Sequence, residues 1–243
     1  MKKTLLNKSI FIVCCVFYIS LNFSFAQMQR QLNLPSYDHE KLHFGFSLAF
    51  NKADFIVFPA DNAHKPDSVW RINNKSQLGF NLGIIADLRI YEYATIRFLP
   101  ALSFQERVLN YTIHPTGAVK ADSIYTSTKR IESTLLDFPI DLKIRSERMN
   151  NVSAYLLAGG KFSIDLASQA KTKNPDIVKL NNKDWAFEVG FGLDFYLEYF
   201  KLSTELKFDA GLKDRLYHEN TAYSNSISKL FTKLWLFSLN FEG

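Results

Sequence analysis

Cysteine is almost missing from this 243-residue chain, which has only Cys14 and Cys15. Both lie in an N-terminal segment, residues 1–26, that reads as a secretory signal peptide. Cleavage before Gln27 would remove both cysteines. We therefore expect a mature chain with no disulfide, no thiol nucleophile and no metal held by cysteine.

The leader has the three expected parts, namely a basic start, an apolar stretch over residues 10–19 and a small-x-small end at Ser24-Phe25-Ala26. The alternative is that this segment stays uncleaved as a transmembrane anchor. The basic start of the signal peptide consists of Lys2, Lys3 and Lys8, and cleavage would lower the formal net charge from +5 to +2. No clustered basic face remains in the mature chain, so we expect no nucleic-acid partner.

Instead of further long apolar runs, the rest of the chain alternates large apolar residues with small or charged ones. Phe80, Leu82 and Ile84, for example, alternate with Gly79, Asn81 and Gly83. A strand directs successive side chains to opposite faces, so each such segment has one apolar and one polar face. The expected strands are 44–51, 77–90, 95–105, 136–145, 155–166, 185–195, 200–212 and 234–241.

The connections between these segments alternate in length. Long polar loops are expected at about residues 53–76, 112–127, 168–183 and 213–227, and short turns at 91–93, 146–151 and 198–199. Outer-membrane barrels have short periplasmic turns and longer outer loops. The sequence therefore predicts an all-β, eight-stranded antiparallel up-and-down transmembrane β-barrel over residues 41–243, after a flexible lead-in at 27–40.

Alternation alone also fits a soluble, lipocalin-like barrel with an apolar interior. Residue size favours the membrane barrel, because Gly, Ala and Ser on the polar faces suit a narrow bore and Phe, Leu and Ile suit an exterior in lipid. Aromatic residues also gather at the expected membrane interfaces. They are Tyr91, Tyr93, Tyr199 and Phe241 at one rim, and Phe50, Phe104 and Trp185 at the other.

The polar faces place charges of both signs inside the barrel. The bases are Arg89, Arg97, Lys143, Arg145, Lys161, Lys201 and Lys207; the acids are Asp87, Asp137, Asp141, Asp165, Glu188, Asp194, Glu205 and Asp209. Buried charges must be paired, so we expect a salt-bridged plug rather than a selective pore, which needs a wet channel or one dominant sign. Pro100 and Pro139 fall within expected strands, and we expect a bulge or a strand end near each.

No catalytic signature accompanies this pattern. The five histidines do not combine with Ser and an acid into a triad, and the chain has no zinc-type spacing, phosphate loop or glycine fingerprint. They are His39, His43, His64, His114 and His218. We expect no catalytic, cofactor-binding or metal-binding residue and no cofactor. Glycines such as Gly190 and Gly192 are interpreted as making room for large neighbours in the bore.

Several stretches resemble the PorT (SprT) family. They are 42–46, 51–55, 79–83, 98–104, 132–139, 158–168 and 223–227, and they occur in the family's order along nearly the whole mature chain. Pro100 and Pro139 belong to these motifs. The resemblance implies an accessory outer-membrane protein of the type IX secretion system, which exports folded cargo and supports gliding in some bacteria.

The leading hypothesis is therefore a non-enzymatic barrel, exported to the bacterial outer membrane, that helps to assemble or operate this secretion system. Its partners would be outer-membrane lipid and other secretion components, reached through the loops or the periplasmic rim. One alternative is a lipid-modifying enzyme using loop residues His64, His114 or His218. A second alternative is a small pore or adhesin.

Overall fold

The computed structural model describes residues 32–60, 69–113, 125–167, 178–219 and 221–243. The chain divides into two units, Met1–Leu32 and Asn33–Gly243, and the second contains the whole sheet. The expected signal peptide and residues 27–31 lie outside the described residues. Within the described ranges, no helix combines the length and the apolar character needed to cross a bilayer.

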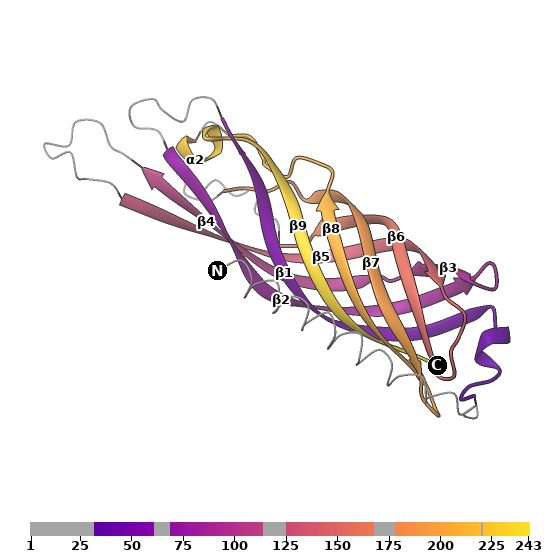
Figure 1. The fold of residues 1–243 in the computed structure, drawn as a ribbon. Coiled ribbons are helices and arrows are strands. Elements are labelled where there is room, and N and C mark those ends of the chain that lie inside the picture. Colours follow the sequence, from indigo (N-terminus) through magenta and orange to yellow (C-terminus); the bar gives the residue numbers. More distant parts are fainter. Residues whose placement is uncertain (1–31, 61–68, 114–124, 168–177, 220) are drawn as a thin grey trace, which may run out of the picture. The chain divides into compact units, whose positions relative to one another are not determined.

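The described residues form one antiparallel sheet with two short helical turns (Figure 1). The elements are η2 (Tyr37–His39), β1 (Leu42–Pro59), β2 (Val69–Arg89), β3 (Ala94–Phe98), β4 (Ala101–Ile113), β5 (Tyr125–Arg145), β6 (Val152–Asp165), β7 (Lys183–Tyr196), β8 (Lys201–Gly211), α2 (Ala222–Asn225) and β9 (Ile227–Glu242).

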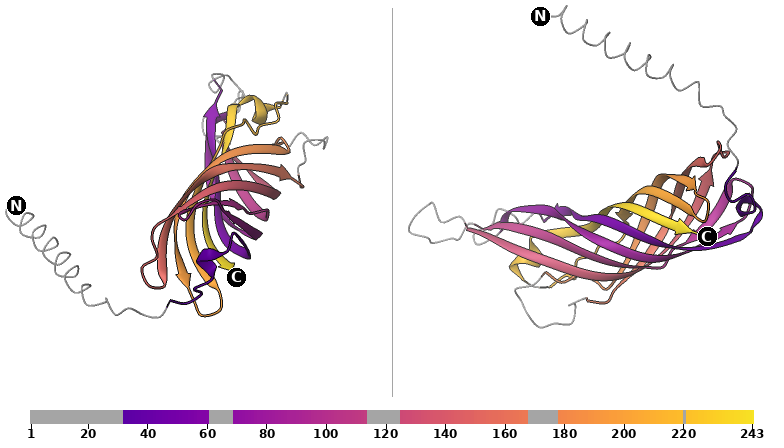
Figure 2. Two further views of the ribbon diagram at one scale, coloured as in Figure 1. Left: turned by 90° about the vertical axis from the view of Figure 1, so that its right-hand side faces the viewer. Right: turned by 90° about the horizontal axis from the view of Figure 1, so that it is seen from below.

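The sheet closes on itself. Apart from β3 and β4, which do not pair with each other, strands adjacent in the chain pair, and β1 pairs with β9 from Gly45–Glu242 to Pro59–Ile227. Strands β3 and β4 follow one another in the same place between β2 and β5, so the ring has eight positions. The curved wall of this ring is visible from two further sides in Figure 2. The predicted eight-stranded up-and-down barrel is confirmed.

A single irregularity accounts for both prolines. The strand end expected at Pro100 is confirmed, because β3 stops at Phe98 and β4 starts at Ala101. The bulge or strand end expected at Pro139 is wrong, because β5 runs through it and keeps its register with β6. The Pro139 carbonyl accepts the Leu99 N–H at 3.4 Å, so its missing N–H faces the same break. One gap in the ladder thus accommodates both residues that cannot donate.

Long and short connections lie at opposite ends of the ring, as predicted. The long-loop end carries 60–68, 114–124, 166–182 and 212–226, and the short-turn end carries 90–93, 146–151 and 197–200. The expected bounds of two loops are wrong. β1 and β2 occupy most of 53–76, and β4 and β5 leave only 114–124 of the second loop.

These strand extensions reverse the polarity of the wall. Leu109 and Tyr111 of β4 are fully buried, whereas the intervening Asn110 and the following Thr112 face outward and are partly exposed. Beyond a membrane the outside is water, so apolar side chains turn inward. The resulting inner cluster, the apolar cap, comprises Phe55, Val69, Leu109, Tyr111, Ile113, Ile131, Val178, Leu180, Leu216, Ile227 and Leu230.

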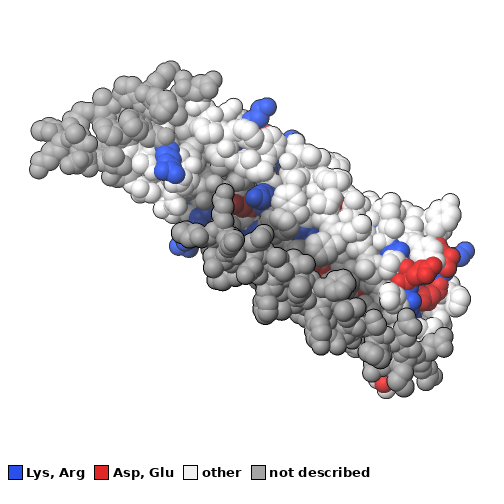
Figure 3. All heavy atoms as spheres, viewed as in Figure 1, with Lys and Arg blue, Asp and Glu red and all other residues white. Residues whose placement is uncertain are grey.

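Lower on the wall, the large apolar side chains point outward and stay exposed. Phe44 is 59% exposed, Phe50 69% and Phe191 58%, while Ser47, between the first two, and Asn51, just after Phe50, are buried. Figure 3 shows one flank on which charged side chains are sparse, with Asp and Glu gathered at the end with the short turns and Lys and Arg scattered toward the other end. An apolar wall of this extent has the character of a lipid-facing surface. The expected facing of all eight strands is borne out by this exposure pattern, including Leu234 and Leu236, which are buried in β9.

Replacing Phe191 with Arg should test the lipid-facing assignment. We expect Phe191→Arg to lower the free energy of unfolding by about 2–4 kcal/mol, the range for a cation on the lipid face near the midplane. The measurement is urea unfolding of the protein in lipid vesicles, followed by tryptophan fluorescence.

The neighbouring Gly192→Arg should fail to fold for a different reason. A Cβ at Gly192 would lie 2.5 Å from the Thr204 carbonyl oxygen and 2.5 Å from the Tyr155 ring. If both variants folded with unchanged stability, the facing of β7 would be wrong.

Candidate functional site

A fully buried arginine organises the short-turn half of the bore. Arg97 of β3 binds both oxygens of Asp87 at 2.8 Å, and its other donors reach Glu205 at 3.0 Å and Glu242 at 2.8 Å. Tyr155 also donates to Glu205, at 2.7 Å. One guanidinium therefore joins β2, β3, β8 and β9 across the bore.

Further ion pairs lie on both sides of Arg97, those of Lys201 and Lys143 toward the short turns and the others toward the long-loop end. Lys201 binds Glu242 at 2.7 Å, and Lys143 binds Asp194 at 2.9 Å. The remaining cations share carboxylates: Lys207 with Glu188, Glu205 and Asp141, Lys161 with Glu188 and Asp209, and Arg215 with Asp165 and Asp184. The bore is filled by a mixed-charge network rather than lined with one sign.

The charges predicted for the bore are all buried except Arg89 and Arg145, which are half-buried at the short-turn end. Sequence reasoning missed Glu242, although the alternation Ser238, Asn240, Glu242 extends the inner face of β9. It also missed Arg107, which lies in β4 near the point where the polarity of the wall reverses, and Arg215, which lies in the segment 213–227 that was expected to be a loop.

The bore leaves little free space. One cavity beside Asp137, Lys161 and Glu188 has a volume of about 20 Å³, and another beside His43, Asp87 and Lys201 is the same size. A volume of this order holds about one water molecule. The apolar cap lies above the network at the long-loop end, so these cavities do not form an open passage through the described residues.

The lead-in closes the short-turn end of the bore. From Asn33 onward it contacts the barrel, and η2 inserts Tyr37, which is 7% exposed. The Tyr37 hydroxyl donates to Glu242 at 2.9 Å, and its ring stacks on His43 with centroids 3.7 Å apart. The segment expected to be flexible is thus anchored over its described part.

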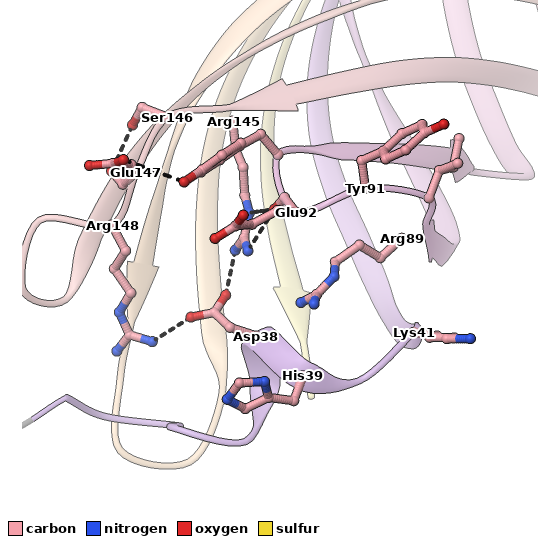
Figure 4. A pocket seen from close by; sticks show the side chains of 12 residues that line it. Asp38, His39, Lys41, Arg89, Tyr91, Glu92, Arg145, Ser146, Glu147 and Arg148 are labelled. Atoms are coloured by element: carbon pink, nitrogen blue, oxygen red, sulfur yellow. Dashed lines mark hydrogen bonds and ion pairs between the residues drawn. The ribbon is translucent and has the colours of Figure 1, made fainter.

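Beside this plug lies a hollow, the rim pocket, with a volume of about 670 Å³ (Figure 4). It lies between the lead-in, the β2–β3 turn and the β5–β6 turn. Its lining residues are Asp38, His39, Lys41, Arg89, Ile90, Tyr91, Glu92, Tyr93, Arg145, Ser146, Glu147 and Arg148.

Arginines dominate the electrostatics of the rim pocket. Asp38 accepts from Arg145 at 2.5 Å and from Arg148 at 3.4 Å. Partial burial alone would raise the pKa of Asp38, but these two guanidinium groups hold it below its ordinary value. Arg89 extends into the pocket (Figure 4), and one of its Nη atoms is shielded from solvent without a hydrogen-bond partner among the described residues. Together with Lys41 and Arg148, Arg89 gives the pocket a cationic lining suited to an anionic group such as a carboxylate.

The structure brings no described histidine into a catalytic arrangement. His43 is buried against Tyr37, and His39 lines the rim pocket. The exposed His218 contacts Asp214 at 3.0 Å, but backbone N–H groups of Leu216 and Leu230 also bind that carboxylate. His64 and His114 lie outside the described residues. Across the described ranges, no three His, Cys, Asp or Glu side chains converge as ligands for a metal ion.

Comparison with known proteins agrees with this architecture. The family model described as outer membrane protein beta-barrel domain matches residues 25–217. A search of curated protein sequences found no match.

Solved structures with a similar fold include Ail of Yersinia pestis in complex with the heparin analogue sucrose octasulfate, at 10% identity and a TM-score of 0.39, covering 84% of this chain and 100% of that one. Neisserial surface protein A is 12% identical with a TM-score of 0.42 and coverage of 83% and 98%. OprG of Pseudomonas aeruginosa is 13% identical with a TM-score of 0.40 and coverage of 83% and 92%.

Removing the central guanidinium should destabilise the barrel. Arg97→Met leaves Asp87, Glu205 and Glu242 as neighbouring buried carboxylates without their shared cation, so we expect a loss of about 3–5 kcal/mol. The matched control is Arg130→Met, because Arg130 is 71% exposed and its one ion pair among the described residues is with Glu106, at 3.3 Å. The control should change stability by less than about 1 kcal/mol. Equal unfolding midpoints in urea would contradict the central role of Arg97.

The lead-in should detach in acid. The pKa of Asp38 is lower in the folded protein than the value of about 3.9 in an unfolded chain. The stabilisation that ionised Asp38 gives to the docked lead-in is therefore complete above the unfolded pKa and is lost as the pH falls through the folded pKa. In the mature protein carrying Ser36→Cys with a fluorophore, anisotropy should be the same at pH 7 and pH 5 and should fall below about pH 4. Asp38→Asn should give the low anisotropy at every pH. A variant that behaves like the parent would exclude this role of Asp38.

Proposed function

Because the chain belongs to the outer membrane protein beta-barrel domain family, we propose that it is a non-enzymatic component or assembly factor of the type IX secretion system. It would sit in the bacterial outer membrane after removal of a signal peptide. It would act by binding other secretion components at the rim or the loops, and would support gliding where that occurs. The resemblance of its motifs to the PorT family is the basis for naming this system.

The filled bore is the observation that carries a role in binding rather than transport. The charges of the bore neutralise one another around Arg97 and Lys207, the lead-in occupies one mouth, and the apolar cap occupies the other. Folded cargo would have no path through such a barrel. Its accessible features are the two ends, and the short-turn end faces the periplasm in barrels of this kind.

The rim pocket is the part of that end best suited to a partner. It is open, has a volume of about 670 Å³, and contains Arg89 with an unsatisfied donor. Exposed Tyr91 and Met149 beside it add apolar surface. Aromatic, Met and Arg side chains are enriched in protein interfaces. A partner with an acidic side chain could therefore bind here without disturbing the Asp38 pair.

A second candidate, an adhesin, is favoured by the strand extensions. Residues of β1, β2, β4 and β5 continue past the apolar wall and carry exposed side chains such as Phe58, Arg71 and Arg130 (Figure 1). These strands form a wall at the long-loop end, where an adhesin would contact another surface. A pore would be revealed by single-channel conductance in a planar bilayer, and a lipid-modifying enzyme by altered lipid species after deletion.

Deletion of the gene should trap secreted cargo in the periplasm, and a plasmid copy should restore export. We expect a copy with Arg89→Glu to restore export poorly, because a carboxylate in the rim pocket would repel an acidic partner. The matched control is Lys75→Glu, the same charge change at an exposed residue of the long-loop end. Normal export in the deletion strain would refute the secretion role. Equal export with both variants would exclude the rim pocket.

A further inference from the structure

Four lysines lie just beyond the apolar wall at the long-loop end, on four consecutive strands of the ring. This lysine arc consists of Lys183 at the start of β7, Lys213 just after β8, Lys233 in β9 and Lys52 in β1. Register sets them near one level: Lys233 pairs with Ala210 on one side and Asp54 on the other, and Lys52 pairs with Trp235. Lys52, Lys183 and Lys213 are exposed, and Lys233 is half-buried.

The lysine arc contains one carboxylate, that of Asp54 opposite Lys233, but no ion pair between described side chains. None of the four forms an ion pair with another described residue, in contrast to the paired lysines of the bore. The nearby acids are occupied: Asp54 accepts from the Phe55 N–H at 2.9 Å and from Asn74 at 2.6 Å, and Asp214 accepts from two backbone N–H groups at 3.0 Å. Asp184 is buried and binds Thr232 at 2.8 Å.

The wall on the membrane side of the lysine arc is aromatic. Trp185 is 55% exposed and Trp235 is 45% exposed, and their rings lie 4.8 Å from those of Phe162 and Phe208. Tryptophan and tyrosine favour the boundary between hydrocarbon and headgroups. The lysine arc is thus placed at headgroup depth, with exposed Phe and Leu side chains further into the membrane.

We propose that the lysine arc binds the phosphate groups of a phosphorylated glycolipid in the outer leaflet of the outer membrane. The long-loop end faces outward in such barrels, so a lipid in that leaflet would meet the lysines with its headgroup and the wall with its acyl chains. The wall from β7 to β1 is about 14 Å wide, from three strand spacings. That width accommodates several acyl chains side by side, as a multiply acylated glycolipid requires.

The charge is not distributed evenly around the ring, which gives the lipid a preferred side. On β4 and β5 at the same end, Arg130 is paired with Glu106 at 3.3 Å, the Lys129 ammonium lies 4.3 Å from the centre of the Tyr223 ring, and Glu132 is exposed. An anionic headgroup would be attracted to β7, β8, β9 and β1 and not to β4 and β5. A free phosphate would gain nothing from the aromatic wall, so the combination specifies a lipid.

The test uses the mature protein in detergent micelles, titrated with lipid A that carries two phosphates and with the same lipid dephosphorylated. Binding is followed by the fluorescence of Trp185 and Trp235. We expect the triple variant K52Q/K183Q/K213Q to bind the phosphorylated lipid on the order of 100-fold more weakly, from about 1 kcal/mol per lysine. The control K41Q/R71Q/R130Q removes the same charge elsewhere and should bind as the parent does.

Lys→Arg replacement at the same three positions should restore binding, and heat-modifiable migration on gels should verify that every variant is folded. Equal affinity for the dephosphorylated lipid, or equal losses in the triple variant and its control, would overturn the proposal. Competition by inorganic phosphate would also overturn it, in favour of a free anion.

Discussion

A bilayer offers no water to hydrogen-bond the backbone, and this constraint explains most of the structure. A sheet in hydrocarbon must pair every edge, and the β1–β9 ladder does so over the height of the wall. The strand break at Leu99 and Pro100 lies where Pro139 opposite has no N–H to leave unpaired. Two prolines that would each disrupt a separate place thus share one gap in the ring.

Closure with eight positions makes the bore narrow, and the narrow bore determines how its charges are arranged. Arg97 can reach carboxylates from three other strands at once because no side of the bore is far from another. The same narrowness explains Gly192, where Tyr155 occupies the space that a side chain would need. Charges that could support transport in a wider barrel form ion pairs with one another here. The two ends remain available to interact with other molecules.

The alternating segments allowed the wall within the membrane to be predicted from sequence, because one face of each strand meets lipid throughout. The extensions were not predicted. On β1, Phe50 faces out, but Lys52 and Asp54 follow on the same face while Phe55 turns in. The outward face of such a strand is apolar within the membrane and polar beyond it. If lipid is assumed along the whole strand, the polar part looks like a loop. The rim pocket was also beyond prediction, since it joins the lead-in to two turns that are distant in sequence.

The contact between Tyr37 and Glu242 links the first element of the barrel to the end of its last strand. Glu242 reaches its position only when β9 has paired with both β1 and β8. Tyr37 therefore has its acceptor only where the first and last strands are paired. The plug that closes the short-turn mouth thus depends on the seam that closes the ring.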